Sequence, residues 1–334
     1  MRWPRFLARR ADASAFHAPA WLEALRRTYG YEPVVYTTSP PGSELNDGLA
    51  FCKINTWLSD RRLVSVPFSD HAALLADDPD IFHRMFSFLQ EQVGTKSCKY
   101  VEVRPTAEPD IGAEGFVRTA TFCWHRLQLD QELEGLYKSF HKNSVQRKIR
   151  RSEREGLTYA EGRSEQLIRR FYRLLLITHR RHRLPPQPIS WFRNLADCWG
   201  DQLKIRVASK DGRDVASIVT LTYKKSMVYK YGCSDAQYHN LGGMVFLFWR
   251  AIQDAKSCAL DELDLGRSDP DNTGLITFKD HWNAARSTLA YWGYPLRLRP
   301  DLNRWHLRAA RGLFAVLPSA VLPRMGQLLY KHMG

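Results

Sequence analysis

The chain has 334 residues, of which 44% are hydrophobic and 25% charged, so it can bury a sizeable core and has room for two domains. Lysine and arginine outnumber aspartate and glutamate by 49 to 35, and the formal net charge of +14 favours anionic partners. No apolar run is long enough to cross a bilayer, and the basic start lacks the apolar segment of a secretory signal. The six cysteines lie far apart without a C-x-x-C pair, which argues against zinc sites and disulfide scaffolds. We therefore expect reduced thiols, no bound metal and a cytoplasmic protein.

The first part of the chain alternates strands and helices. Runs rich in β-branched and aromatic residues predict strands at 32–38, 61–68 and 99–105. Pro, Gly, Ser and Asn predict a loop at 39–48, and apolar residues on one face predict a helix at 80–93. This pattern indicates an α/β domain that ends near residue 130.

A new pattern begins after residue 130. Helical periodicity comes first, then three strands within 203–234 with Asp-Gly and Lys-Lys turns between them. A helix at 241–260 is apolar nearly all round its first half and is therefore expected to be buried. Strands at 260–266 and around 288–294 complete a second α/β domain with a mixed, mostly antiparallel sheet. The helices preceding the three strands are predicted at 132–140, 143–156, 165–182 and 190–200.

The tail after residue 300 is basic and apolar. From Trp305 onward it contains cations and no acid, a composition that suits an anionic membrane surface. A helical pair packed on the domain, or a mobile end, is the alternative. The cations are Arg308, Arg311, Arg324 and Lys331.

The stretch 141–156, "HKNSVQRKIRRSEREG", concentrates six lysines and arginines. Val145 and Ile149 lie one helical turn apart and predict a narrow buried stripe, while Arg147, Arg151 and Arg154 share another side. No aromatic residue for base stacking lies between Lys142 and Gly156, so we do not expect DNA as a partner. The stretch is either a solvated helix or a site that steers an anionic substrate.

Two loops carry candidate chemistry. In "YKYGCSDAQYHNLGG" (229–243) a strand leads through a turn into a helix that starts at Gly242 and Gly243, where free N–H groups suit a pyrophosphate. In "DLGRSDPDNTGL" (264–275) Asp264 or Asp269 could deprotonate an amine, and Arg267 could hold a phosphate or carboxylate. A structural turn and a structural Asp–Arg pair are the respective alternatives.

The helix at 165–182 ends in "THRRH" before "RLPPQP". Arg180 and Arg181 could bind a substrate phosphate, although cations at a helix C-terminus are also favourable through the helix dipole alone. Nothing in the sequence places a neighbouring histidine opposite an amine. No serine-nucleophile, P-loop or zinc-protease motif occurs, so direct attack by an acceptor amine is the simpler mechanism.

Five pieces in this order (141–156, 178–188, 229–243, 264–275 and "TFKDHWNA" at 277–284) resemble the FemAB-like proteins of the Gcn5-related acyltransferase (GNAT) superfamily. "VSVPFSDHAALLA" (64–76) is similar to the matching part of their first domain. Such proteins are often encoded in bacterial polysaccharide and peptidoglycan gene clusters. The resemblance implies two tandem GNAT-like domains, each a mixed, mostly antiparallel sheet flanked by helices. The divisions are a degenerate domain at 1–130, an acyltransferase domain at 131–300 and the tail at 301–334.

The resemblance also implies site residues. Lys279 matches the lysine of the family's F-K motif, which contacts the acceptor, and Asn283 stands where the family has glycine. The coenzyme A loop of the superfamily, Q/R-x-x-G-x-G/A, is matched imperfectly at Asn240, Leu241, Gly242 and Gly243. A backbone N–H near Tyr231 is the expected oxyanion donor. Further substrate contacts are expected from Ser234, Asp235 and Tyr238.

The function implied is N-acyl transfer from acyl-CoA, a co-substrate rather than a bound cofactor, to an amine of a sugar, lipid-linked envelope precursor or peptide. An aminoacyl-tRNA-dependent FemAB-type peptidyltransferase is the alternative. It is disfavoured because the chain has no room for the long helical arm of those enzymes. A catalytically inactive GNAT-like scaffold or binding protein is the alternative from another class. We expect a cytoplasmic enzyme, peripheral at the inner face of the membrane.

Overall fold

The computed structural model describes residues 2–56, 59–95, 97–108, 115–295, 326 and 329–332. Contacts divide the chain into two compact units: the described residues of 1–122, 288–302 and 328–334, and those of 123–287 and 303–327. The sequence-based division at residues 130 and 300 refers to family repeats rather than to packing, and it stays a prediction. The tail lies almost entirely outside the described residues. In the described part of the chain, no helix has both the length and the apolarity of a membrane span.

In its described part, the first unit contains a mixed sheet in the strand order β1-β2-β3-β4-β11, with helices α1, α2 and α3. The β3 and β4 strands are parallel, whereas β1, β2 and β11 pair antiparallel with their neighbours. Apolar side chains of β2, β4 and α3, including Phe51, Val101 and Leu89, form its core. The elements are α1 (Arg2–Arg9), α2 (Pro19–Tyr29), β1 (Glu32–Tyr36), β2 (Leu49–Thr56), β3 (Ser59–Val64), α3 (Pro79–Gly94), β4 (Tyr100–Val103) and β11 (Ala285–Tyr294).

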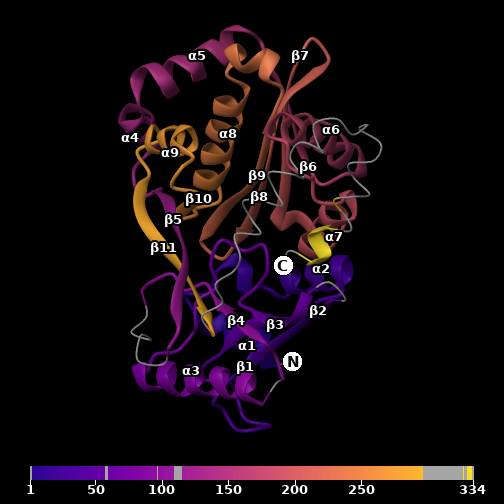
Figure 1. Ribbon diagram of the computed structural model, residues 1–334. Helices are drawn as coiled ribbons and strands as arrows, with labels where there is room; N and C mark the ends of the chain where they lie inside the picture. The colour runs from indigo at the N-terminus through magenta and orange to yellow at the C-terminus, as the bar shows by residue number, and fades with distance from the viewer. Residues whose placement is uncertain are drawn as a thin grey trace. The chain divides into compact units, whose positions relative to one another are not determined.

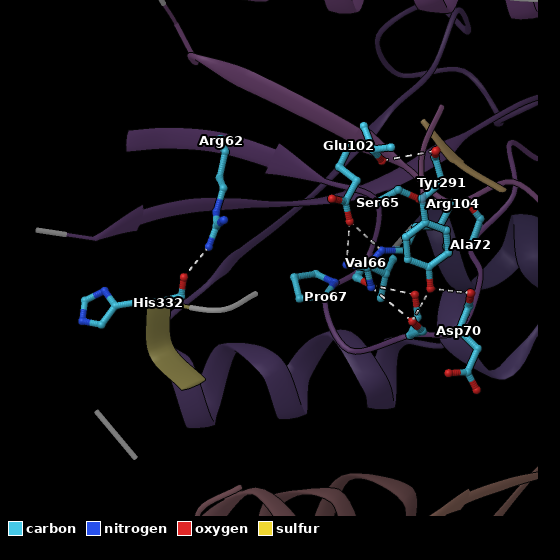
Figure 2. A network of polar contacts seen from close by, with 12 residues as sticks. Arg62, Ser65, Val66, Pro67, Asp70, Ala72, Glu102, Arg104, Tyr291 and His332 are labelled. Atoms are coloured by element: carbon cyan, nitrogen blue, oxygen red, sulfur yellow. Dashed lines mark hydrogen bonds and ion pairs between the residues drawn. The ribbon is translucent and has the colours of Figure 1, made fainter. Parts of the chain in front are cut away.

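The strand predicted at 61–68 is wrong beyond Val64. Residues 65–72 form a buried loop in which Val66 and Phe68 adopt left-handed backbone angles, with φ of 52° and 59°. Arg104 holds this loop: its Nη1 donates to the carbonyls of Val66 and Ser69, both at 3.1 Å, and it pairs with Glu102 at 2.8 Å (Figure 2). We call residues 65–72 the clamped loop.

The second unit has the strand order β5-β10-β9-β8-β7-β6, and among its described strands only the β9–β10 pair is parallel. This mixed, mostly antiparallel sheet confirms the predicted fold class. Figure 1 shows α8 lying across the strands of this unit. The strands are β5 (Val117–Gln128), β6 (Thr158–Gly162), β7 (Leu203–Lys210), β8 (Arg213–Tyr223), β9 (Ser226–Ser234) and β10 (Glu262–Ser268). The helices are α4 (Leu133–Ser139), α5 (Arg147–Arg154), α6 (Glu165–His182), α7 (Ile189–Trp199), α8 (Gly243–Ser257) and α9 (Thr273–Asp280), with 3-10 turns η4 (Gly200–Gln202) and η5 (Ala236–Leu241).

The helix predicted at 143–156 is not continuous. A π-helical turn, η3 (Lys142–Gln146), precedes α5, and the side chain of His141 accepts a hydrogen bond from Ser144 N at its start. Val145 and Ile149 are buried, as their spacing predicts, and they join the core cluster that α8 shares with α4 and β8. The basic side chains are thereby left on the outside of α5.

Candidate functional site

The parallel strands β9 and β10 pair over only a short length. Ser226–Val228 pair with Glu262–Asp264, and the pairing ends there. Beyond that point β9 contains an extra residue, Lys230, relative to β8, and the register of β10 with β5 shifts between Asp264 and Arg267. Such bulges re-aim a strand and interrupt its pairing. The sheet therefore offers space at the C-terminal ends of β9 and β10, where loops commonly carry function.

A pocket of about 400 Å³ occupies this region of the second unit. One part of its wall is apolar and comes from β8, α8 and α9. The other part is polar and comes from α5, α6, β9 and η5. The lining residues are Lys148, Arg181, Val215, Ala216, Tyr229, Ser234, Tyr238, His239, Gly242, Gly243, Met244, Val245, Gly274, Leu275 and Phe278.

The start of α8 borders the pocket because two glycines allow close packing there. Gly242 caps the helix with a left-handed φ of 77°, and a Cβ on it would lie 3.1 Å from the carbonyl oxygen of Lys148. A Cβ on Gly243 would lie 3.0 Å from Val215 Cγ2 and 3.1 Å from Ala216 Cβ. The N–H groups of a first helical turn have no intrahelical partner, and with the helix dipole they favour an anion. The prediction of an open helix start at these two glycines is confirmed, while its ligand stays a prediction.

A cluster of polar side chains lies at the same end of the pocket. Ser234 Oγ is 2.9 Å from His239 Nε2, and a guanidinium nitrogen of Arg181 is 3.5 Å from the same imidazole nitrogen. Burial, and secondarily Arg181, lower the pKa of His239, so the imidazole is neutral near pH 7. The positively charged side chains that line the pocket near pH 7 are therefore Lys148 and Arg181. Lys148 and His239 were not among the predicted site residues, although His239 occupies the first position of the glycine-loop pattern.

The predicted motifs at 178–188 and 229–243 meet at this cluster. Thr178 Oγ1 donates to the carbonyl of Ser234 at 3.1 Å and accepts from its N–H at 2.9 Å, which ties the last turns of α6 to the end of β9. Arg181 follows Thr178 by one turn and therefore reaches the pocket, whereas Arg180 is exposed and does not line it. Asp235 caps η5 by accepting from Gln237 N at 3.0 Å.

Three tyrosines lie near the pocket with different surroundings. Tyr229 lines it, and burial raises the pKa of its hydroxyl, which stays protonated. Tyr238 also lines it and accepts from Arg213 Nη1 at 3.1 Å. Tyr231 accepts from Trp191 Nε1 at 2.7 Å, so its side chain is engaged by α7. Its backbone follows the bulge at Lys230, where the expected oxyanion donor remains a prediction.

Two predicted site residues, Asp264 of β10 and Lys279 of α9, stabilise the bulge of β10. Asp264 is 2% exposed and accepts from Trp124 Nε1 at 2.8 Å and Gly266 N at 2.7 Å. Lys279 is 1% exposed and donates to the carbonyls of Gly266 and Arg267 at 2.7 and 3.1 Å. Both side chains thus stabilise the turn at Gly266, whose φ is 70°.

Several predicted residues lie apart from the pocket lining. Asp269 is exposed and Arg267 half-buried in the loop after β10. Asn240 is exposed, and Leu241 is buried in the core shared with α8. Asn283 has a φ of 56°, so it adopts the left-handed conformation expected where the family has glycine. The roles assigned to these residues stay predictions. Within the described residues, no group of three or more His, Cys, Asp or Glu side chains is arranged to hold a metal ion.

The arrangement combines an anion-binding end with an apolar wall. Helix N–H groups, Lys148 and Arg181 suit a phosphate, whereas Val215, Leu275 and Phe278 suit an aliphatic arm. Such a pocket can hold and orient a phosphate-bearing carrier.

Comparison with known proteins agrees with this geometry. Residues 139–279 match the sequence model of the acetyltransferase (GNAT) domain. The crystal structure of FemX superposes with a TM-score of 0.70 at 13% identity, covering 90% of this chain and 96% of that one. The C-terminal domain of a lysylphosphatidylglycerol synthetase from Agrobacterium fabrum gives 0.55 at 16% identity and 92% coverage of both chains. No curated protein matches the sequence.

A tandem GNAT protein from the clavulanic acid biosynthesis pathway shares the fold as well, with a TM-score of 0.53 at 12% identity over 88% of this chain and 91% of that one. At these identities the superpositions establish the fold, while the domain match covers the part of the chain that carries the pocket. The domain match supports a transferase. Residues 139–279 form a GNAT-type acetyltransferase domain, and the chain shares its fold with FemX and with a tandem GNAT protein.

Proposed function

We propose that the protein is an N-acyltransferase that transfers an acyl group from acyl-CoA to an amine of a sugar, lipid-linked envelope precursor or peptide. The observation that carries this proposal is the pocket at the start of α8, which joins an anion-binding helix end to an apolar wall. A pyrophosphate would lie against Gly243, Lys148 and Arg181. The pantetheine arm would follow Val215 and Phe278 toward the opening between β9 and β10.

In this proposal the acceptor amine attacks the thioester carbonyl directly. A C–N bond forms, the C–S bond breaks, the amine loses a proton and the thiolate gains one. The backbone N–H groups of β9 near Tyr231 are the proposed donors to the oxyanion. Tyr229 has a buried, protonated hydroxyl in the pocket and is the proposed donor to the leaving thiolate.

The proton acceptor for the amine is proposed to be Asp269, alone or through water. Asp269 is exposed in the loop after β10, whereas Asp264 is occupied by hydrogen bonds from Trp124 and Gly266. Lys279 and Arg267 are proposed to orient the acceptor through the turn that they share. Peripheral membrane attachment through the tail stays a proposal of the same kind.

Thermal shift with acetyl-CoA and a long-chain acyl-CoA tests the proposal. Wild type and Arg173→Gln, an exposed arginine two turns before Arg181 on α6, are expected to be stabilised by the thioesters, and Arg181→Gln much less. No response of the wild type to any thioester would overturn the proposal.

Aminoacyl transfer from charged tRNA is the second candidate. The resemblance in fold to FemX and to a lysylphosphatidylglycerol synthetase, whose name denotes a lysyl product, favours it. The phosphate-binding end of the pocket would serve a terminal nucleotide as well. A thermal response to charged tRNA, without one to acyl-CoA, would select this candidate.

A further inference from the structure

A second hollow, of about 580 Å³, lies on the outside of the π-helical turn η3 and helix α5. Amide side chains of Asn143 and Gln146 contribute to it, and the rest of its lining is cationic. We call it the α5 hollow. Its five cationic residues are Lys142, Arg147, Arg150, Arg151 and Arg154.

The local structure explains why these side chains gather. Residues 147, 150, 151 and 154 are spaced three and four apart, so they share the face of α5 opposite the buried Ile149. The wider π-helical turn places residues 142, 143 and 146 beside them, and such turns often occur at functional sites. Like charges at these spacings repel one another, which costs stability unless anions neutralise them.

Among the described residues, few acidic side chains neutralise the cations of the α5 hollow. Arg151 pairs with Glu155 at 3.4 Å, but within the described parts of the chain no acidic side chain lies within ion-pair distance of the other four cations. Elsewhere in the same unit arginines are paired, as Arg170 is with Asp214 at 2.7 Å and Arg193 with Glu165. The α5 hollow therefore concentrates positive charge that acidic side chains of the described residues do not neutralise.

Two of its side chains are also held in place. Arg150 Nε donates to Tyr137 Oη at 3.0 Å, and Gln146 Nε2 donates to the carbonyl of Phe140 at 2.8 Å. Because these contacts already restrict the two side chains, less side-chain entropy is lost when a ligand binds. The hollow is thus partly organised before any ligand arrives.

We propose that the α5 hollow binds a ligand that carries a diphosphate, such as a nucleoside diphosphate or a diphosphate-linked carrier. Guanidinium groups bind phosphate oxygens in pairs, and four cations without an acidic partner exceed what one phosphate needs. The lining holds no apolar or aromatic side chain, so it offers neither base stacking nor insertion among lipid chains. The site is separate from the donor pocket, to which the same helix contributes Lys148.

Calorimetric titration of the full chain with inorganic pyrophosphate and with adenosine diphosphate tests this site. Orthophosphate and sulfate at equal ionic strength serve as reference anions. We expect saturable binding of both diphosphates and at least about tenfold weaker binding of the reference anions. Because the donor pocket is also proposed to bind a pyrophosphate, the comparison is made in the Arg181→Gln background. There Arg147→Gln combined with Arg154→Gln is expected to lower diphosphate affinity about 100-fold, roughly tenfold for each charge-assisted contact removed.

Two further variants locate the binding. Arg163→Gln with Lys225→Gln removes the same charge from other surfaces of the unit and is expected to bind diphosphate as wild type does. Arg181→Gln changes the donor pocket and is expected to retain the hollow's affinity. An equal loss in the charge-matched variant would overturn the proposal. So would a loss confined to Arg181→Gln, or binding of RNA or of phosphatidylglycerol vesicles without binding of pyrophosphate.

Discussion

The clamped loop of the first unit and the donor pocket of the second use similar side chains in opposite ways. In the clamped loop Arg104 is 8% exposed, and its guanidinium is occupied by Glu102 and by the carbonyls of Val66 and Ser69 (Figure 2). In the pocket Arg181 is exposed, and its hydrogen-bond contacts with the described residues are 3.4–3.5 Å long. The first arginine is committed to the fold, and the second is available to a ligand.

The difference shows that an arginine's role depends on how many hydrogen-bond and ion-pair partners surround it, not on its residue type alone. Tyr291 reinforces the clamped loop by donating to the carbonyl of Asp70 at 2.7 Å, so the left-handed angles of Val66 and Phe68 are held by remote residues. The helix start at Gly242 and Gly243 instead leaves donors facing a cavity. Mutations in the first region should therefore change stability, and mutations in the second should change binding.

The largest effect is expected for Arg104→Met. It would leave Glu102 buried without its cation and remove the donors that hold the left-handed residues, and loss of one partner of a buried pair typically costs about 3–5 kcal/mol of unfolding free energy. Urea denaturation measures this loss. Arg118→Met, at an exposed pair with Glu108, is the control and should cost less than about 1 kcal/mol. Equal losses in both variants would contradict the role of the clamp.

A second large effect concerns acid stability and His17, which is buried in the first unit. Its Nδ1 lies 3.0 Å from the N–H of Ser14 and its Nε2 3.0 Å from the carbonyl of Ala73, an arrangement that fits the neutral ring. Burial lowers the pKa of His17 to about 4. The unfolded chain binds the proton first, so stability is full above pH ~6.5 and falls by about 3 kcal/mol as the pH drops to ~4.

Urea denaturation of wild type and His17→Gln between pH 7 and pH 4 checks this dependence. Glutamine cannot be protonated, so the variant should lose about 3 kcal/mol less than wild type over that range. Parallel stability profiles for the two proteins would show that His17 is not the titrating group.

Arg181→Gln tests the prediction that a mutation in the pocket changes binding rather than stability. We expect about a tenfold loss of acyl-CoA affinity, which corresponds to about 1.4 kcal/mol, with little change in unfolding free energy. Arg173→Gln on the same helix provides the matched control, because its cation lies 3.5 Å from Asp214 and does not line the pocket. A large loss of stability without a loss of affinity would place Arg181 among the structural arginines.

A stability effect smaller than those at Arg104 and His17 is expected for Gly242→Ala. A Cβ at φ 77° costs about 1 kcal/mol, and it would also press on the carbonyl oxygen of Lys148 at 3.1 Å. Because this shifts the helix start, donor affinity should fall together with stability. Gly156→Ala, at a φ of 66° and with open space around it, should cost similar stability but leave donor affinity unchanged.

Local patterns predicted much of the fold. The helix at 165–182 has the bounds that the structure shows, and the strands of 203–234 turn at the predicted Asp-Gly and Lys-Lys pairs. The end of β3 could not be predicted, because the clamped loop depends on Arg104 and Tyr291, which are distant in the sequence. The π-helical turn before α5 has no periodicity signal of its own.

The site was predictable only where a motif and the pocket coincide. Arg181, Ser234, Tyr238, Gly242 and Gly243 were named from the sequence and line the pocket. The rest of its lining comes from α5, β8, β9, η5, α8 and α9. Residues 148, 274, 275 and 278 lie in motifs quoted from the sequence, but only tertiary packing brings them to one pocket. Asp264 was predicted as a general base, and Lys279 as an acceptor contact from the family resemblance; these roles stay predictions. The structure adds that both side chains hydrogen-bond the backbone of Gly266, which the sequence did not indicate.

Hydrogen–deuterium exchange with and without acyl-CoA tests the central claim most directly, because it follows the backbone donors themselves. We predict slower exchange at the N–H groups of residues 243–245 when acyl-CoA is bound, and unchanged exchange in the clamped loop. Unchanged exchange at residues 243–245 at a saturating concentration of acyl-CoA would contradict the assignment of this helix start as the donor site.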